Sequence, residues 1–213
     1  MTVQPVKYTC GNPAKIVILA SGSGTLAQAL IDAATSADGA PYEIVAIGSD
    51  LAACTALDRA ATAGIPTFTV SLKQYASRAE WDAALAQACL AHGAELVVLA
   101  GFMKLVGEPF LAALPGRVIN AHPSLLPSFP GMYAPADALN HGVKLTGCTV
   151  FLVDGGIDAG PIVAQRAVEV ADDDDVESLH ERIKIAERSL LVDVVTAMSA
   201  GGWQVEERKV ILG

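Results

Sequence analysis

The chain has 213 residues and a formal net charge of −9, from 14 basic and 23 acidic residues. Because nucleic acids and anionic membranes are bound by clustered Lys and Arg, this charge argues against both as partners. Hydrophobic residues make up 52% of the chain, yet no apolar run approaches the ~20 residues of a membrane-spanning helix. These features predict one domain with a sizeable core that is poor in aromatic side chains.

The first 14 residues contain neither the apolar stretch nor the clustered basic residues of a secretory signal. We interpret residues 1–14 as an N-terminal extension of a single domain over 1–213, and we expect a cytoplasmic protein. The four cysteines are far apart and form no Cys-x-x-Cys pair, which predicts free thiols rather than disulfides or a zinc site. They are Cys10, Cys54, Cys89 and Cys148.

Short apolar runs alternate with stretches of helical spacing over the first two thirds of the chain. This alternation is typical of a parallel sheet that is covered by helices on both faces. Strands are predicted at 15–20, 42–49, 66–71, 95–100 and 117–120, and helices at 25–37, 53–63, 77–92 and 108–114. Ser77 is the predicted N-cap of the third helix, and Glu80 completes a capping box.

After residue 120 the sequence becomes rich in proline. We expect a functional loop at 121–133, a helix at 134–141, β-rich runs at 146–153 and 161–170, a helix from 175 to about 200, and a strand or hairpin arm at 204–212. The two β-rich runs are joined by a connection that is too short for a helical crossover, so they should be antiparallel. The predicted fold class is therefore α/β: a doubly wound, mostly parallel, Rossmann-like sheet with antiparallel edge strands.

The first candidate site is the turn at 21–27 (SGSGTLA), between the first predicted strand and helix. Its glycines permit a tight turn, and the free N–H groups of the helix start can bind an anion. The string also fits G-x-G-x-x-A, the looser dinucleotide fingerprint, with Asp50 placed to bind a ribose. A phosphate site is favoured, while a structural turn and a dinucleotide site stay open.

A second candidate is the pair Asn120 and His122, two residues apart at the end of a predicted strand. Their side chains should project from the same face, into the crevice where ligands bind in open α/β sheets. From chemistry alone, a structural role for this histidine is equally well supported. The other histidines are interpreted as structural, because two precede glycines at helix ends and one lies among charged neighbours: His92, His141 and His180.

Two acidic segments are further candidates for a binding or catalytic site. The glycine-rich turn at 154–161 is either a plain connection, a binding loop for a polar heterocycle, or a loop that places one carboxylate against His122. The run of four aspartates at 172–175 precedes a helix, so we interpret it as an N-terminal cap rather than a metal site.

Three segments in this order resemble the folate-dependent formyltransferase family: 99–106 (LAGFMKLV), 120–131 (NAHPSLLPSFPG) and 154–165 (DGGIDAGPIVAQ). The resemblance covers about 15–191. It implies the Rossmann-like formyltransferase fold and transfer of the formyl group of 10-formyltetrahydrofolate, a co-substrate, to the amine of 5′-phosphoribosylglycinamide in purine biosynthesis. It also implies small-molecule partners, no metal, and a homodimer as one oligomeric state to consider.

The resemblance also implies residue roles. Asn120 would hold the oxyanion, His122 would donate a proton, and Asp158 would favour protonated histidine and order water. The ribonucleotide site would comprise Gly24, Thr25, Leu26, Lys184 and Glu187. The folate site would comprise Arg78, Met103, Lys104, Leu105, Val106, Asn120, Asp154, Gly155, Gly156, Ile157 and Asp158.

The chain departs from the family pattern at several ligand positions. The family often has Asn at the position of Leu26, Arg at Lys104, and His at the positions of Tyr133, Phe151 and Arg188. These departures leave the three proposed catalytic residues intact, so they affect ligand affinity more than the reaction. Because the net charge opposes anionic substrates, binding is expected to depend on the N–H groups of 24–26 and on single cations at Arg78, Lys104 and Lys184.

Three other functions are consistent with part of these features. A formyltransferase acting on charged tRNA should carry a basic RNA-binding domain, and a formyltetrahydrofolate hydrolase should carry an additional regulatory domain. A nucleotide-binding sensor would use Gly22 and Asp50 and leave His122 idle.

Overall fold

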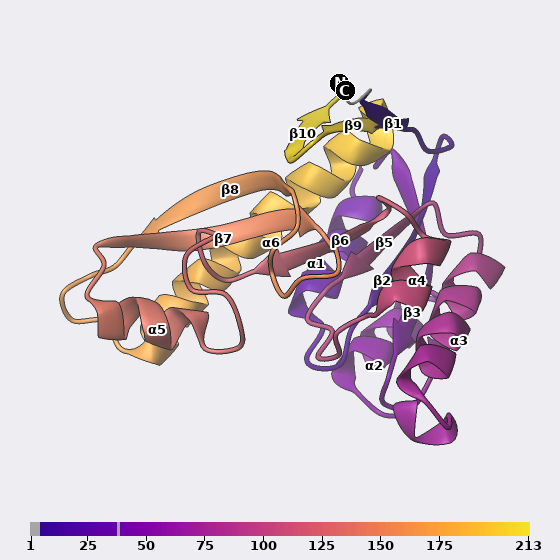
Figure 1. Cartoon of the computed structure of the whole chain (residues 1–213), viewed down its shortest axis with the longest axis horizontal. Helices are drawn as coiled ribbons and strands as arrows, with labels where there is room; N and C mark the ends of the chain where they lie inside the picture. Colours follow the sequence, from indigo (N-terminus) through magenta and orange to yellow (C-terminus); the bar gives the residue numbers. More distant parts are fainter. Residues whose placement is uncertain (1–4, 38) are drawn as a thin grey trace.

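The computed structural model describes residues 5–37 and 39–213. It is an α/β protein built on a seven-stranded sheet with the order β4-β3-β2-β5-β6-β7-β8 (Figure 1). Neighbouring strands from β4 to β6 are parallel, whereas β7 is antiparallel to both β6 and β8. The predicted fold class is confirmed, including the antiparallel edge.

The predicted helices and strands are found in the predicted order, with ends that differ by a few residues. The strands of the large sheet are β2 (Ala14–Leu19), β3 (Tyr42–Ser49), β4 (Thr67–Thr69), β5 (Leu96–Leu99), β6 (Val118–His122), β7 (Leu145–Leu152) and β8 (Ile162–Glu169). The helices are α1 (Thr25–Ala34), α2 (Thr55–Thr62), α3 (Arg78–Ala91), α4 (Glu108–Ala113), α5 (Ala134–His141) and α6 (Val176–Gly201). A single 3-10 turn, η1 (Leu72–Gln74), precedes α3.

Two hydrophobic cores cover the two faces of the large sheet. Helices α1 and α6 lie on one face and α3 and α4 on the other, as Figure 1 shows. The central strand β5 is buried along its whole length, as expected for a strand covered on both faces. Both cores are built mainly from Ala, Val, Leu and Ile, in agreement with the low aromatic content of the chain.

The strand order reverses between β2 and β5. From β2 the chain proceeds outward to β3 and β4, and then returns to add β5 and β6 on the other side. The loops that follow β2 and β5 therefore separate at this point and open a crevice at the carboxyl ends of the strands, where ligands bind in such sheets. The turn at 21–24 and the segment at 100–107 both lie here.

The predicted capping box of α3 is half correct. Ser77 Oγ accepts a hydrogen bond from the Glu80 N–H at 3.2 Å, as predicted. The Glu80 carboxylate, however, accepts from the Ala76 N–H rather than from that of Ser77. The side chain reaches one residue further, so the helix start is stabilised but the reciprocal pair is not formed.

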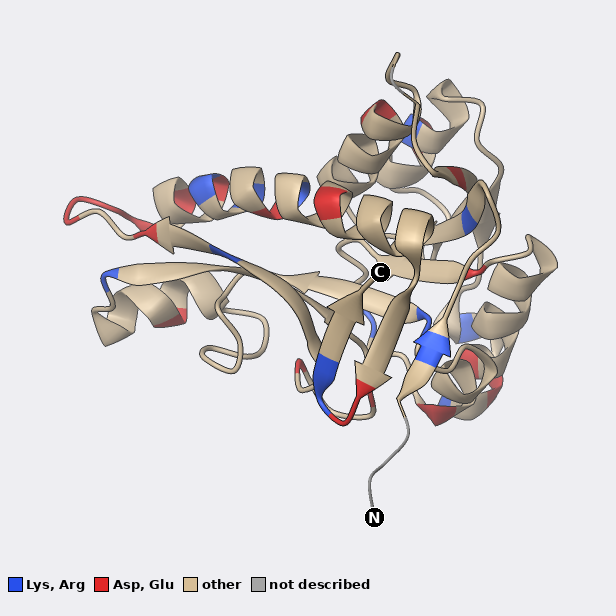
Figure 2. Ribbon diagram, turned by 90° about the horizontal axis from the view of Figure 1, so that it is seen from above, with Lys and Arg blue, Asp and Glu red and all other residues tan. Residues whose placement is uncertain are grey.

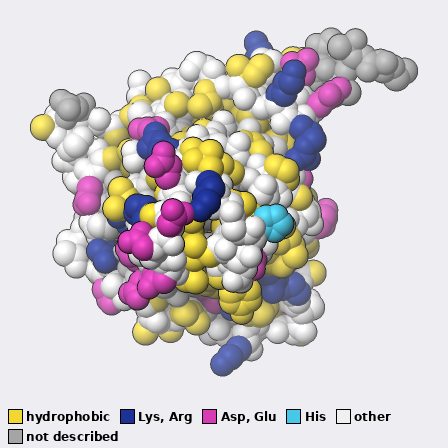
Figure 3. Space-filling view, turned by 90° about the vertical axis from the view of Figure 1, so that its left-hand side faces the viewer, with side chains coloured by type: hydrophobic (Ala, Val, Ile, Leu, Met, Phe, Trp, Pro, Cys, Tyr) yellow, Lys and Arg dark blue, Asp and Glu magenta, His cyan; other side chains and the backbone are white. Residues whose placement is uncertain are grey.

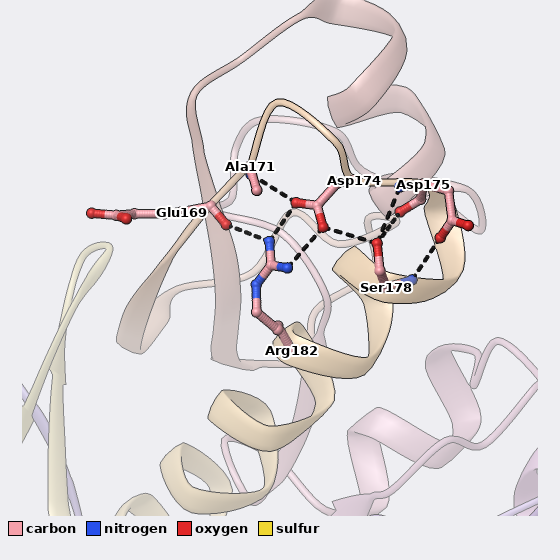
Figure 4. Close-up of polar contacts among 6 residues, drawn as sticks. All are labelled: Glu169, Ala171, Asp174, Asp175, Ser178 and Arg182. Carbon is pink, nitrogen blue, oxygen red and sulfur yellow. Dashed lines mark hydrogen bonds and ion pairs between the residues drawn. The ribbon is translucent and has the colours of Figure 1, made fainter.

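The acidic run before α6 is a capping structure, as predicted (Figure 4). Asp175 and Ser178 form a reciprocal capping box, while Asp174 binds the Arg182 guanidinium, the Ser178 hydroxyl and the Ala171 N–H. The hydrogen bond with Arg182 lowers the pKa of Asp174 far below its usual range. The red turn between β8 and α6 in Figure 2 is this segment.

A small second sheet joins the two ends of the chain. It has the order β1-β9-β10, from β1 (Val6–Tyr8), β9 (Trp203–Glu206) and β10 (Lys209–Leu212), all antiparallel. Tyr8 stacks on Trp203 with ring centroids 5.2 Å apart. The hairpin corresponds to the predicted arm at 204–212, whereas β1 was not predicted. Residues 1–4 of the predicted extension lie outside the described residues.

Two further sequence predictions concern thiols and membrane segments. The four cysteines are free, and burial raises the pKa of both Cys89 and Cys148 to about 12. Within residues 5–37 and 39–213, no helix has the length and apolar character needed to cross a bilayer.

Candidate active site

Asn120 and His122 both lie on β6, which extends two residues beyond the predicted strand. Their register partners on β7 are Phe151 and Thr149, so the two side chains project from the same face of the sheet, as predicted. His122 is only 5% exposed, whereas Asn120 is half-buried. The strand therefore places a shielded imidazole next to an amide that is partly open to a ligand.

The two ring nitrogens of His122 each face an oxygen atom. Nε2 lies 2.9 Å from the carbonyl oxygen of Phe129, and Nδ1 lies 3.5 Å from Oδ2 of Asp158. A carbonyl oxygen only accepts hydrogen bonds, so the Nε2 atom carries a hydrogen. A doubly protonated ring would have one hydrogen-bond acceptor for each N–H: the Phe129 carbonyl at Nε2 and the Asp158 carboxylate at Nδ1.

Asp158 is held in the loop between β7 and β8 by contacts from two other parts of the chain. It has a φ of 49°, in the left-handed region, and its Oδ2 accepts a hydrogen bond from the Gly131 N–H at 2.8 Å. The next two carbonyls, of Ala159 and Gly160, accept hydrogen bonds from Arg208 in the β9–β10 turn. The small sheet thus supports the loop that carries the carboxylate. The prediction that this loop places a carboxylate against His122 is confirmed in its geometry.

A set of polar side chains that no sequence pattern indicated braces the loop after His122; in it Ser124 and Thr149 are fully buried, whereas Gln165 is exposed. Ser124 Oγ donates to the carbonyl oxygens of Ser128 and Phe129, the latter being the oxygen that contacts His122. Thr149 Oγ1 donates to the Ser124 carbonyl and accepts from the Leu126 N–H. Gln165 on β8 donates to Thr149. This network fixes the oxygen that orients the imidazole; the pairing of β7 with β8 brings Thr149 beside Gln165, and the loop after β6 folds back onto them.

The turn after β2 has the shape expected of an anion site. Gly24 has a φ of 69°, and a Cβ atom there would lie 2.7 Å from Ala56 Cα, so the turn requires glycine. Helix α1 begins at Thr25 with no side-chain cap, which leaves its first N–H groups free for a ligand. Leu26 is buried in the core, so only its backbone faces the turn.

The dinucleotide interpretation of this turn is not supported. Asp50, the predicted ribose ligand, is 4% exposed. One of its carboxylate oxygens binds Ser21, and the other is paired with Lys104. Its two oxygens are thus already engaged within the protein.

Part of the predicted folate set lines one cavity of about 450 Å³. Its walls are Arg78, Met103, Lys104, Leu105, Val106 and Gly107. The Arg78 guanidinium lies 4.7 Å from the Trp81 ring centroid and donates to the Leu105 carbonyl. Met103 and Leu105 are about two-thirds exposed, at 65% and 64%. The loop at 154–158 is not part of this wall, and Ile157 in it is 60% exposed.

The three predicted single cations have other partners in the structure. Lys104 pairs with Asp50, and Lys184 pairs with Glu181 at 2.7 Å. Arg78 lies near Asp82 at 3.9 Å. Their charges are partly neutralised by neighbouring acids, which the sequence analysis did not anticipate.

Glu187 lies one turn after Lys184 on α6 and is 6% exposed. Burial raises the pKa of its carboxyl group to about 7, although Arg188 and Lys184 act in the opposite direction. A larger cavity of about 540 Å³ lies between α1 and α6, and Thr25, Arg59 and Arg188 line it. Neither Glu187 nor Lys184 is on its wall.

Basic side chains do not gather into a patch on the face of the molecule shown in Figure 3, where they lie between acidic ones. Among the described residues, no cluster of three or more His, Cys, Asp or Glu has a metal-binding arrangement.

Comparison with known proteins identifies a family to which the chain is similar. Residues 14–195 match the family described as "Formyl transferase". The chain is 49% identical to phosphoribosylglycinamide formyltransferase of Mycobacterium tuberculosis over 210 residues, which is 99% of this chain and 96% of that protein.

Solved structures show the same likeness. Glycinamide ribonucleotide transformylase 1 of Symbiobacterium toebii superimposes with a TM-score of 0.90 at 42% identity, over 93% of each chain. Phosphoribosylglycinamide formyltransferase of Coxiella burnetii, in complex with CHES, gives a TM-score of 0.88 at 34% identity, over 93% of this chain and 92% of that one. In sequence and in fold, the similarity therefore extends over nearly the whole chain.

Proposed function

The chain belongs to the formyl transferase family, and on that premise we propose that it transfers the formyl group of 10-formyltetrahydrofolate to the amine of phosphoribosylglycinamide, a step of purine biosynthesis. The observation that carries the proposal is the convergence of His122, Asp158 and Asn120 at the end of β6. The likeness to enzymes named for this substrate, at up to 49% identity over nearly full length, supports the choice of acceptor.

The proposed reaction begins when the amine of the ribonucleotide attacks the formyl carbon. A tetrahedral intermediate forms, and its oxygen gains negative charge. The half-buried amide of Asn120 donates a hydrogen bond to this oxygen without giving up its own proton. The C–N bond to the folate then breaks, the product amine keeps the formyl group as an amide, and the folate nitrogen gains a proton.

In this mechanism His122 supplies that proton through Nδ1. Its Nε2 hydrogen is engaged by the Phe129 carbonyl, so Nδ1 is the nitrogen available for transfer. Asp158, 3.5 Å away, stabilises the imidazolium and orients the water through which the proton travels. The proton that the attacking nitrogen loses restores the charged ring, so the cycle is balanced.

We place the ribonucleotide phosphate at the N–H groups of Gly24, Thr25 and Leu26, with Lys184 as a further contact to the phosphate and Glu187 as a contact to the ribose. We place the folate between the cavity wall at 103–106, with Arg78, and the loop at 154–158. Two of the departures from the family pattern are compatible with this arrangement: Leu26 would offer its backbone, and Phe151 is buried beside Asn120 in the sheet.

The proposal extends to the setting of the reaction. We expect a single domain over 1–213 in the cytoplasm, with small molecules as partners and no metal ion in the mechanism. Sedimentation at several protein concentrations tests whether the chain forms a homodimer.

The decisive experiment is a formyl-transfer assay with and without glycinamide ribonucleotide. Folate release that depends on the ribonucleotide is the expected result, whereas release that is indifferent to it identifies a hydrolase. Ligand-dependent melting is the second measurement: a folate analogue and the ribonucleotide should both raise the melting temperature. Stabilisation by NAD alone would contradict the proposal.

A further inference from the structure

A buried polar network connects the ends of three neighbouring strands. Ser21 Oγ donates to Asp50 Oδ1 at 2.6 Å and accepts a hydrogen bond from the Met103 N–H at 2.9 Å. The other oxygen of Asp50, Oδ2, lies 3.3 Å from Lys104 Nζ. Ser21 is 8% exposed and Asp50 is 4% exposed. The serine–aspartate hydrogen bond is therefore shielded from bulk water, whereas the side chain of Lys104 is 35% exposed.

The network lies at the point where the strand order of the sheet reverses. Ser21 follows β2, Asp50 follows β3, and Met103 lies in the segment after β5, so the contacts cross the switch point of the sheet. A backbone hydrogen bond from the Ser21 N–H to the Gly101 carbonyl, at 3.1 Å, crosses the same crevice. The turn after β2 and the segment after β5, which otherwise diverge, are thus joined directly across the crevice.

Hydrogen bonding and an opposite charge stabilise the buried carboxylate of Asp50 in this network. Removing a carboxylate from water is costly unless hydrogen bonds and an opposite charge compensate for it. Asp50 has both: the hydroxyl of Ser21 and the ammonium group of Lys104. The buried carboxylate can therefore keep its compensation only while the turn at 21–24 and the segment at 103–106 stay in their observed arrangement.

We propose that Asp50 is a positioning residue that couples the binding of the two substrates, by holding the ribonucleotide turn and the folate segment in one arrangement. The inference rests on the proposed function, because it takes the turn as the ribonucleotide side and 103–106 as the folate side. A substrate that restricts the motion of one segment also restricts the other, because the hydrogen bonds through Ser21 and Asp50 join the two. The second substrate then binds to a segment whose remaining conformational freedom is already reduced.

Two variants break different links. Asp50→Asn keeps an acceptor for the Ser21 hydroxyl but leaves Lys104 without its counter-charge. Ser21→Ala keeps the ion pair but removes the bridge to the Met103 N–H. Both should weaken the coupling, and an exposed acid on the neighbouring helix α2 provides the matched control, Asp58→Asn.

Calorimetric titration with a 10-deazafolate analogue, which carries no transferable formyl group, measures the coupling directly. The Kd of the analogue is determined without and with saturating glycinamide ribonucleotide. In the native protein the ribonucleotide should tighten binding by about five-fold or more. The ratio should fall towards one in Asp50→Asn and Ser21→Ala and stay at the native value in Asp58→Asn. The KM values of both substrates should rise more than kcat falls.

Two results overturn the inference. One is a native protein that binds both ligands independently, and the other is a native ratio in both folded variants. Should Asp50→Asn fail to give a native circular dichroism spectrum, the ratio in Ser21→Ala decides. Failure of the proposed function is distinct, since it appears as absence of ribonucleotide-dependent formyl transfer by the native protein.

Discussion

His122 on β6 and Asp158 in the β7–β8 loop lie with Nδ1 and Oδ2 3.5 Å apart, and their side chains are 6% and 13% exposed. The pair is shielded from bulk water but is adjacent to the half-buried Asn120 on the same strand face. Solvent therefore screens the interaction between the imidazole and the carboxylate only weakly.

The first prediction concerns this pair. His122→Ala and Asp158→Asn should each lower kcat by about two orders of magnitude or more, because proton transfer to the departing folate nitrogen is lost. Single-turnover formyl transfer measures the effect. His92→Gln is the control, since His92 stacks on Phe68 instead. Near-native turnover by either variant would remove that residue from the catalytic set.

Asn120 gives a second prediction that separates binding from chemistry. Asn120→Ala removes the proposed oxyanion donor and should lower kcat by about 10² to 10³. Native melting temperature and unchanged ribonucleotide affinity, measured by titration, would show that the loss is chemical. A variant that changes KM but keeps kcat would assign Asn120 to folate binding alone.

Glu187 makes stability depend on pH. Its pKa is raised from 4.5 to about 7 by burial, so the folded protein binds more protons than the unfolded chain between these values. The free energy of unfolding should therefore fall as pH rises from about 4.5 through 7, by on the order of 3 kcal/mol for this group. Urea unfolding at several pH values measures this fall.

Glu187→Gln tests the assignment, because a neutral side chain should remove that part of the pH dependence. The difference in unfolding free energy between native protein and variant should itself change across pH 4.5 to 7. Glu177→Gln, at an exposed position of the same helix, is the control. Parallel curves for the native protein and Glu187→Gln would exclude a raised pKa at this residue.

The fourth prediction concerns the turn before α1. Gly24→Ala forces a Cβ to within 2.7 Å of Ala56 Cα at a φ of 69°, and should destabilise the protein by about 1–3 kcal/mol. Displacement of the turn should also weaken ribonucleotide binding more than folate binding. Gly64→Ala is the control for backbone strain alone, because Gly64 has a similar φ of 70° but no atom within 4 Å of its Cβ position. Equal ribonucleotide affinities in both variants would argue against a phosphate site at Gly24.

Local patterns in the sequence predicted most of the fold. The bounds of β3 and α5 were predicted without error, because an apolar run and helical spacing are properties of neighbouring residues. Strand β1 was missed, since it has only three residues, two of them exposed, and its partner β9 lies near the other end of the chain. No periodicity can reveal a pairing of that kind.

In the candidate site, too, some features could be predicted from the sequence and others could not. Period-two geometry was sufficient to place Asn120 and His122 on one face, and the glycine requirement of the first turn is visible in the string itself. Lys104 and Lys184, which the sequence predicts as single cations, are paired in the structure with Asp50 and Glu181. An ion pair depends on the distance between side chains, which is set by how the segments pack.

The amino-acid sequence by itself determined the alternation of strands and helices, the antiparallel edge and the strand at whose end His122 lies. Only the tertiary structure decided that Nδ1 faces Asp158, that the Phe129 carbonyl holds Nε2, and that Asp50 joins two segments across the switch point. The physical reason is the separation along the sequence of the residues that interact. Periodicity is created by residues a few positions apart, whereas these contacts join loops that only the order of strands in the sheet brings together.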